Sequence, residues 1–141
     1  MCFMSIILAI DYGKVKSGIA VSDDSQVFAF GLTTIKTNSV IDYIDKYNSG
    51  NNISEFVIGQ PKRMNDEFSD IEELIKKFIN KLTLKFPNIP IKRFDERFTS
   101  KIALQTMIDA GLNKKNRSDK YIIDKISATI ILQGYLKSIE K

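Results

Sequence analysis

Three carboxylates in this sequence stand beside apolar segments, where a charge is unusual. Asp11 closes an apolar run near the N-terminus, Glu96 lies just past the short strand-like stretch Ile91–Phe94, and Asp124 lies inside a mostly apolar segment. A carboxylate that loses its water is costly unless it is paired or bound to a metal. If the three converge, a divalent cation offsets their repulsion, and oxygen-only ligands favour Mg²⁺ or Mn²⁺ over zinc. Such a site activates water and stabilises the leaving oxygen in phosphodiester cleavage.

Each acid also has a purely structural interpretation. Asp11 can cap the turn that follows it, which is a common use of an Asp close before Gly. Glu96 can pair with Arg93 or Arg97, and Asp124 can pair with a lysine on the same helix face, Lys120. Taken singly, the structural interpretation is favoured for each acid. Taken together, and with the composition of the chain, the three acids favour a metal site.

The composition removes most other catalytic chemistry. The chain has 141 residues and no histidine, which excludes Ser-His-Asp and Cys-His catalysis, histidine zinc sites and imidazole acid–base chemistry. Its one cysteine excludes a disulfide within the chain. No apolar stretch has the length of a membrane span, and the first residues lack the pattern of a signal peptide. We therefore expect a cytoplasmic protein with no membrane partner.

The net charge of +4 is unevenly distributed along the chain. Residues 1–60 carry four lysines against six acidic residues, whereas residues 61–141 carry seventeen Lys or Arg against eleven acidic residues. A basic half favours a polyanionic partner such as nucleic acid, although solubility explains a lysine-rich surface equally well. The candidates for phosphate contacts are Lys14, Lys16, Lys114, Lys115 and Arg117, the last three in a polar loop for which simple solvation is the alternative.

Apolar and alternating runs predict the secondary structure. The predicted strands are Ser5–Asp11, Ser17–Asp23, Val27–Thr37, Glu55–Gly59 and Ile91–Phe94. The predicted helices run from Asn38 or Ser39, as cap, to about Tyr47, over Asp66–Lys85, from Thr99 or Ser100 to Ala110, and over Lys120–Lys137. The polar stretch Asn48–Asn52 is expected to end the first helix. No linker or repeat interrupts this order, so residues 1–141 are expected to form a single domain.

The order of these elements predicts an α/β fold. The turns between the first three strands are short enough for hairpins, which favours an antiparallel meander. Two further strands reached through helices extend it to a mixed five-stranded sheet with helices on both faces. Asp11 then stands at the carboxyl end of the first strand, where open α/β sheets place ligands. Glu96 stands at the corresponding end if the fifth strand runs parallel to the first.

Four stretches, in this order and with this spacing, resemble the YqgF/RuvX family, which has a ribonuclease H-like fold related to Holliday junction resolvases. The resemblance covers nearly the whole chain. The stretches are Leu8–Gly13 continuing to Gly18–Asp23, Val57–Pro61, Asp95–Ser100, and Ile123–Ala128 with Ile131–Gln133.

The resemblance implies a metal-dependent nuclease, for which trimming of the 5′ end of pre-16S rRNA is proposed in this family. Its older naming implies a Holliday junction resolvase acting on branched DNA. By the same resemblance Asp11, Glu96 and Asp124 are the catalytic, metal-binding acids, and Arg97 positions a phosphate. The expected partners are nucleic acid, with precursor rRNA favoured, and ribosomal particles.

Two positions depart from the family pattern. Lys16 stands where the family usually has Arg, which keeps the charge but loses the bidentate fork. The loop after Met64 lacks the usual glycine. All three acids are present, so the sequence gives no sign of an inactive enzyme.

Two other functions stay open at this point. A non-catalytic RNA- or ribosome-binding module would keep the acids for folding. The opening Asp11–Gly13 is also similar to the phosphate-binding hairpin of actin-like ATPases, which need two such domains around the nucleotide.

Several neighbouring residues have simpler interpretations. For Tyr12, packing is favoured over stacking on a base, and Ser22 and Asp23 are typical of a turn rather than of catalysis. Gly13 and Gly18 suit either a plain hairpin or a backbone contact with phosphate.

Overall fold

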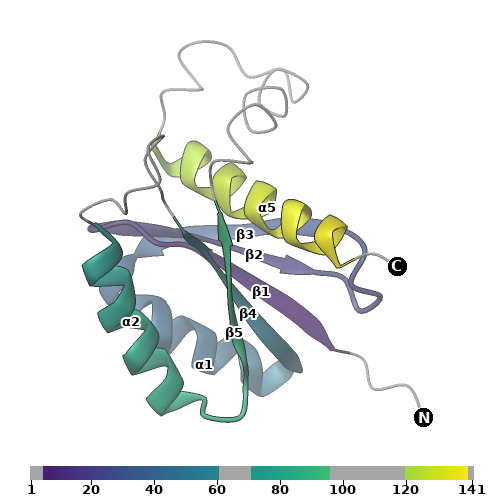
Figure 1. The fold of residues 1–141 in the computed structure, drawn as a ribbon, viewed down its shortest axis with the longest axis horizontal. Helices are drawn as coiled ribbons and strands as arrows, with labels where there is room; N and C mark the ends of the chain where they lie inside the picture. The colour runs from purple at the N-terminus through teal and green to yellow at the C-terminus, as the bar shows by residue number, and fades with distance from the viewer. Residues whose placement is uncertain (1–4, 61–70, 96–119, 140–141) are drawn as a thin grey trace.

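The computed structural model describes residues 5–60, 71–95 and 120–139, with residues 120–125 described by their backbone alone. The elements, drawn in Figure 1, are β1 (Ile6–Asp11), β2 (Lys16–Ser22), β3 (Ala29–Lys36), the 3₁₀ turn η1 (Thr37–Ser39), α1 (Val40–Gly50), β4 (Ile53–Gln60), α2 (Ile71–Lys85), β5 (Ile91–Asp95) and α5 (Lys120–Ser138). The helix predicted to end at Ala110 and the first residues of the helix predicted from Asp66 lie outside the described residues.

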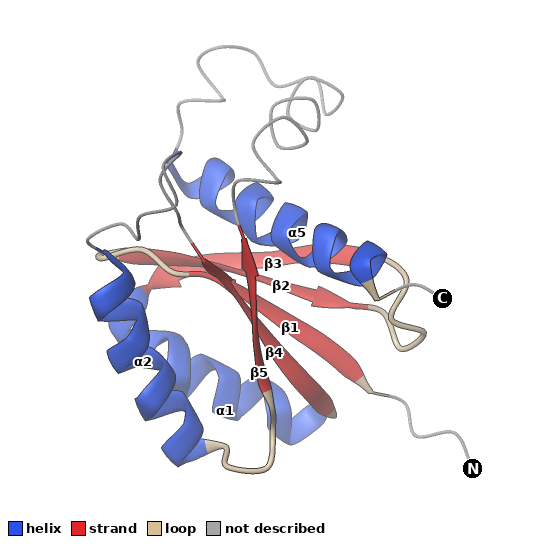
Figure 2. Cartoon of the chain, viewed as in Figure 1, coloured by secondary structure: helices blue, strands red, loops and turns tan. Residues whose placement is uncertain are grey.

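The five strands form one mixed sheet in the order β3-β2-β1-β4-β5. The pairs β1–β2 and β2–β3 are antiparallel, whereas β1–β4 and β4–β5 are parallel. This arrangement, coloured by secondary structure in Figure 2, confirms the predicted meander extended by two parallel strands. Since β1, β4 and β5 are parallel, their carboxyl ends lie at the same edge of the sheet.

Helices cover both faces of the sheet, as Figure 1 shows. On one face, α1 and α2 pack through Ile44 and Phe78 against strand residues such as Ile10. On the other face, which we call the α5 face, Ala128 and other residues of α5 pack against residues such as Ala9. Successive side chains of a strand point to opposite faces, so the apolar run of β1 is buried on both sides. Among the described helices, none combines the length and apolar character needed to cross a membrane.

The first helix begins where the sequence predicted it but ends later. Ser39 occupies the N-cap position of α1, but its side chain makes no capping bond and its Oγ instead bonds to Asn38 Oδ1 at 3.4 Å. The helix continues to Gly50 rather than ending near Tyr47. The polar residues there bond to the last turn: Ser49 Oγ donates to Lys46 O at 2.6 Å. Because such side chains satisfy carbonyls at the helix end, the polar stretch extends the last turn instead of breaking it.

The turn between β2 and β3 confirms the interpretation of Asp23 as a turn residue, whereas Ser22 is the last residue of β2 and is buried. The N–H of Ile7 donates to Ser22 Oγ at 2.8 Å, beside the register shift between Ile6 and Ile7. Asp23 Oδ1 accepts hydrogen bonds from the N–H groups of Val27 and Phe28, each at 2.8 Å. The N–H of Phe28, with a smaller contribution from that of Val27, holds the pKa of Asp23 below its ordinary value.

Candidate active site

Asp11 is the last residue of β1, at the edge where three parallel strands end. It pairs with Gly18 of β2, and on the other side Ile10 pairs with Ile58 of β4. Ala9 belongs to the core on the α5 face and Ile10 to the core beneath α1 and α2, so strand alternation puts Asp11 on the α5 face. The start of α5 lies at this same end of the sheet (Figure 1).

Tyr12 follows Asp11 and lies on the opposite face. Its ring centroid is 5.2 Å from that of Phe78 in α2, with the planes at 47°. Burial raises the pKa of Tyr12 above its ordinary value. The ring contact confirms packing as a role of Tyr12, and the neutral hydroxyl leaves it available as a hydrogen-bond donor.

A ring of hydrogen bonds fixes the turn after Tyr12. The N–H of Gly13 donates to Ser17 Oγ at 3.2 Å, and Thr37 Oγ1 donates to the carbonyl of Gly13 at 2.6 Å. Ser17 Oγ and Thr37 Oγ1 lie 2.7 Å apart; since the one hydroxyl proton of Thr37 is used on Gly13, Ser17 is the donor between them. The ring therefore holds Gly13 rigidly beside the end of β1.

Gly13 is required by the shape of this turn. A Cβ at this position would lie 2.2 Å from the carbonyl oxygen of Lys16, which is part of the backbone and has no room to move. Close approach within the hairpin therefore accounts for this glycine, whatever the substrate does. Lys14 and Lys16 extend from the same turn and are exposed.

Lys16 faces another lysine across the sheet. It is the first residue of β2 and pairs with Lys36, the last residue of β3. Like charges directly opposite each other destabilise a strand pair, and a bound anion relieves that repulsion. Alternation from Ala20, which belongs to the core on the α5 face, puts Lys16 on the same face as Asp11.

A buried ion pair attaches α2 to the carboxyl ends of β4 and β5. Arg93 Nη2 lies 2.6 Å from Glu72 Oε1 and donates to the carbonyl of Gly59 at 3.0 Å. Arg93 Nε donates to the carbonyl of Ile58 at 3.2 Å. The side chain of Glu72 is 3% exposed, and the guanidinium serves it together with two carbonyls. The other partner considered for Arg93, Glu96, lies outside the described residues.

Tyr135 of α5 is a second buried tyrosine, on the α5 face, that the sequence did not single out. Burial raises its pKa, and a hydrogen bond with the side chain of Glu55 raises it further. The hydroxyl is thus held protonated, and its role is to join α5 to β4. The only signal in the sequence was its place in the mostly apolar last helix.

The remaining predicted site residues lie largely outside the described residues. These are Glu96, Arg97, Lys114, Lys115 and Arg117, while Asp124 lies in α5 where the structure describes only the backbone. Within the described part of the chain, no group of three or more His, Cys, Asp or Glu side chains comes together to hold a metal. Of the three predicted acids, Asp11 is therefore the one whose side chain the structure places.

The fold defines a ribonuclease H-like α/β protein with an acid at the carboxyl edge of its sheet. RuvC of Thermus thermophilus, solved in complex with a Holliday junction substrate, is similar in structure with a TM-score of 0.57 and 14% identity, over 95% of this chain and 94% of that one. A second T. thermophilus RuvC structure gives a TM-score of 0.55 at 12% identity, over 94% of this chain and 95% of that one.

The chain belongs to the RuvX family, whose model, described as a Holliday junction resolvase, matches residues 5–138. A protein of Phocaeicola vulgatus named "Putative pre-16S rRNA nuclease" is 50% identical over 96% of this chain and 97% of its own length. A protein of Flavobacterium psychrophilum with the same name is also 50% identical, over 94% of this chain and 97% of its own length. Membership makes this chain a nuclease, an enzyme that hydrolyses phosphodiester bonds.

Proposed function

We propose that this protein is a divalent-metal-dependent nuclease that processes the 5′ end of pre-16S rRNA during ribosome biogenesis. The observation that carries the proposal is Asp11, an acid at the carboxyl edge of the parallel strands and on the face covered by α5. The names of relatives that match along nearly the whole chain support rRNA as the substrate. Such a precursor is found in the cytoplasm, on ribosomal particles, which are the compartment and partner we propose.

The geometry of the described residues supports Glu96 and Asp124 as the acids that join Asp11. Phe94 of β5 packs on the α5 face, and Glu96 follows it two residues later in the sequence. Ala128 of α5 is buried against the sheet on that face, and position 124 is one helical turn before it. The positions of Phe94 and Ala128 therefore support adding Glu96 and Asp124 to Asp11 in the proposed site.

The donor set fits Mg²⁺ or Mn²⁺. The three acids supply only carboxylate oxygens, which hard divalent cations prefer, and the sequence offers no histidine to compete for zinc. When bound, the metal supplies an activated water and charge stabilisation for the leaving oxygen. The chain's own contribution is to hold Asp11 still, through the hydrogen-bonded turn at Gly13, and to present lysines to the phosphates.

The proposed phosphate contacts are Lys14, Lys16, Arg97, Lys114, Lys115 and Arg117. Lys16 has the firmest support, because its strand partner is Lys36 and because alternation puts it on the face of Asp11. Since these contacts neutralise phosphates, binding is expected to weaken steeply as salt rises.

The test is cleavage of pre-16S rRNA and of a four-way DNA junction, side by side, in a titration of Mg²⁺ and of Mn²⁺. Wild type should cut the RNA only with metal, and Asp11→Asn should lower the rate by at least about a hundredfold, since removing one charge-stabilising group costs that much. Asp42→Asn, an exposed acid of α1, is the control and should cut normally. Equal cleavage by Asp11→Asn and wild type would refute the proposal.

The branched-DNA alternative is favoured by the description of the family model. It predicts that the junction, not the rRNA precursor, is cut and that the same Asp11→Asn variant loses that activity. A non-catalytic RNA-binding module predicts cleavage of neither substrate. It also predicts that Asp11→Asn lowers the melting temperature without metal, whereas removing one of several repelling carboxylates from a metal site leaves that temperature unchanged or raises it.

A further inference from the structure

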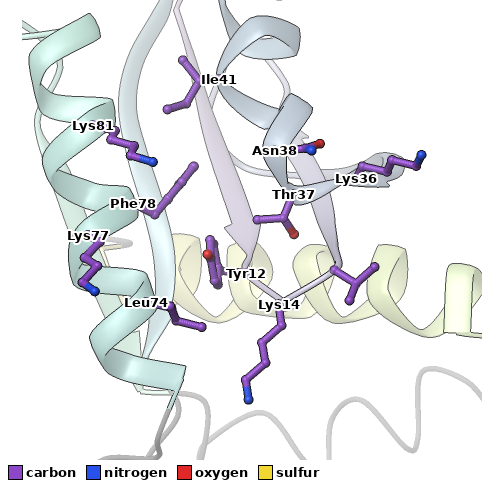
Figure 3. Close-up of a pocket in the computed structure, with 11 residues that line it drawn as sticks. Tyr12, Lys14, Lys36, Thr37, Asn38, Ile41, Leu74, Lys77, Phe78 and Lys81 are labelled. Carbon is purple, nitrogen blue, oxygen red and sulfur yellow. The ribbon is translucent and has the colours of Figure 1, made fainter.

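A basic cleft lies on the face of the sheet opposite α5, beside the end of β1. Its volume is about 540 Å³, within the range of roughly 300–1,000 Å³ that small-molecule sites occupy. It lies between the turn after β1, the start of α1 and the side of α2 that faces Tyr12 (Figure 3). We call it the lysine cleft, and its lining residues used below are Tyr12, Lys14, Leu74, Lys77, Phe78 and Lys81.

The floor of the lysine cleft is aromatic and aliphatic. Tyr12 and Phe78 pack at 5.2 Å between ring centroids, and Tyr12 is only half-buried, so its ring is partly available to a ligand. Figure 3 shows Leu74 beside the two rings, on the side of α2 that faces Tyr12. Flat, partly exposed rings of this kind stack on nucleobases of any sequence.

The rim of the lysine cleft is positively charged. Lys77 and Lys81 lie one helical turn apart on α2, and both are exposed, as is Lys14 on the turn after β1. In Figure 3 the side chain of Lys81 reaches across Phe78, whereas a fourth lysine, Lys36, points away. Among the described residues, no carboxylate lies within ion-pair distance of Lys14, Lys77 or Lys81.

The charge of the rim has an energetic consequence. Like charges four residues apart on a helix destabilise it slightly, and neither Lys77 nor Lys81 forms an ion pair with a described carboxylate. An anion held between them and Lys14 would remove that repulsion. The cleft therefore combines a stacking floor with a cationic rim, which suits a nucleotide.

The lysine cleft is continuous with the catalytic edge. Asp11 and Tyr12 are consecutive residues, so their Cα atoms are about 3.8 Å apart, yet their side chains lie on opposite faces. A nucleic-acid strand that crosses the sheet edge at Asp11 reaches the cleft within a nucleotide or two. Lys14, on the turn that forms this edge, lies on the path between them.

We propose that the lysine cleft binds one nucleotide of the single-stranded segment flanking the bond that is cut. Its phosphate lies among Lys14, Lys77 and Lys81, and its base lies on Tyr12. This inference rests on the proposed nuclease function, which supplies the strand that crosses Asp11. It adds a subsite on the other face of the sheet from the catalytic acids.

The experiment measures the affinity of a short fluorescent single-stranded RNA for Asp11→Asn protein, in which the proposed cleavage is blocked. Adding Lys77→Gln and Lys81→Gln should weaken binding about tenfold at about 0.1 M salt and lower the slope of log K against log salt by about 0.7, since the cleft holds one phosphate and each lost phosphate contact contributes about 0.7. The matched control is Lys46→Gln with Lys137→Gln, which removes two exposed lysines outside the cleft and should change the affinity less than twofold.

A second variant tests the floor of the cleft. Tyr12→Leu keeps an apolar contact with Phe78 but removes the stacking surface, and it should weaken RNA binding about fivefold with a nearly unchanged salt slope. A thermal melt of each variant verifies that it is folded. If Lys77→Gln with Lys81→Gln binds the RNA as the lysine control does, the inference is overturned. Binding of free AMP that needs these lysines, with RNA binding unchanged, would also overturn it and assign the cleft to a free nucleotide.

Cleavage separates failure of this inference from failure of the proposed function. Lys77→Gln with Lys81→Gln, in a chain with Asp11 intact, should raise the KM for single-strand-flanked RNA and leave hydrolysis of bis-p-nitrophenyl phosphate, which is too small to reach the cleft, unchanged. If this double variant and wild type have equal KM values for the RNA and hydrolyse the small substrate equally well, the proposed nucleotide site in the lysine cleft is refuted and the nuclease function is not. If wild type hydrolyses no substrate in the presence of metal, the proposed nuclease function is refuted. The RNA affinities of the variants still test whether the lysine cleft binds a nucleotide.

Discussion

The two faces of the sheet differ in the size of the side chains that cover them. On the α5 face the packing residues include Ala9, Ala20 and Ala128, all fully buried. On the other face isoleucine and phenylalanine dominate, with Ile10 and Phe56 fully buried beneath α1 and α2. The distance between packed elements follows the side chains between them, so α5 can lie closer to the sheet than α1 and α2.

This difference in layer thickness separates two kinds of chemistry at one edge. Close approach of α5 suits a metal site, which needs short distances between acids on strand and helix. The thicker layer leaves room between α2 and the end of β1, where the lysine cleft opens beside Tyr12. Alternation along β1 then sends Asp11 to one face and Tyr12 to the other. A single strand end thus serves both faces.

The largest expected effect comes from the face beneath α2. Arg93→Met leaves the carboxylate of Glu72 buried without a partner and should lower the free energy of unfolding by about 3 kcal/mol. Urea unfolding measures this loss of stability. Lys92→Met, at the exposed neighbouring position of β5, is the control and should change stability by less than about 0.5 kcal/mol.

A double variant sharpens this prediction. Arg93→Met with Glu72→Leu removes both charges and should recover most of the lost stability, since replacing a buried pair by apolar groups is often neutral. If Arg93→Met alone lowers the free energy of unfolding by less than about 1 kcal/mol, the ion pair does not hold α2 to the strand ends. The ion pair is then not one of the features that distinguish the two faces.

An intermediate effect is expected on the α5 face at Gly134. A Cβ there would lie 2.7 Å from Cζ of Phe94, so Gly134→Ala forces the helix or the ring to move. Overpacking destabilises by about 2 kcal/mol, whereas the higher helix propensity of Ala stabilises by about 1 kcal/mol. We therefore expect the free energy of unfolding to fall by about 1 kcal/mol.

The matched control is Gly50→Ala at the end of α1, where nothing lies within 4 Å of the added Cβ. In thermal and urea unfolding, Gly134→Ala should lower the free energy of unfolding, whereas Gly50→Ala should raise it or leave it unchanged. Phe94→Leu in the Gly134→Ala background should relieve the crowding. Stabilisation by Gly134→Ala would show that α5 does not need its close approach to β5.

The smallest effect is expected at Asp23, which belongs to neither face. Asp23→Ala removes the acceptor of two turn N–H groups and should cost about 1 kcal/mol in the free energy of unfolding at neutral pH. Because the folded-state pKa of Asp23 is lowered, its contribution is present above the unfolded pKa of about 3.9 and is lost as pH falls through the folded value.

Urea unfolding of wild type and Asp23→Ala between neutral pH and about pH 3 measures this dependence, and the two curves should converge at the acid end. Asp24→Ala, at the exposed neighbouring position, is the control and should follow wild type. A constant difference between Asp23→Ala and wild type at every pH would contradict a role for the ionised carboxylate.

Much of the fold was predictable from local patterns. Alternation and short turns predicted the meander, and the sheet order confirms it together with the two parallel strands. The end of α1 was wrong by about one turn, because Ser49 and its neighbours bond to helix carbonyls instead of interrupting them. Ser39 was correctly placed at the N-cap, but the capping bond expected of it is absent from the described structure.

The candidate site was predictable in part. Asp11 at a strand end was visible from the apolar run before it, and its position is confirmed. Glu72 stands in the first turn of α2, where an acid suits the helix dipole, and Lys77 and Lys81 are exposed lysines of the same helix. Their second roles, in the lysine cleft and in the ion pair with Arg93, depend on which elements α2 packs against.

The sequence by itself determined which segments are strands and helices and that an acid ends the first strand, because these depend on side chains a few residues apart. Only the tertiary structure decided that Arg93 binds Glu72, that Gly13 is closed into a ring with Thr37, and that Tyr12 packs on Phe78 of α2. These partners are distant in the chain and come together only when helices and sheet pack, since packing and not local propensity sets which surfaces meet.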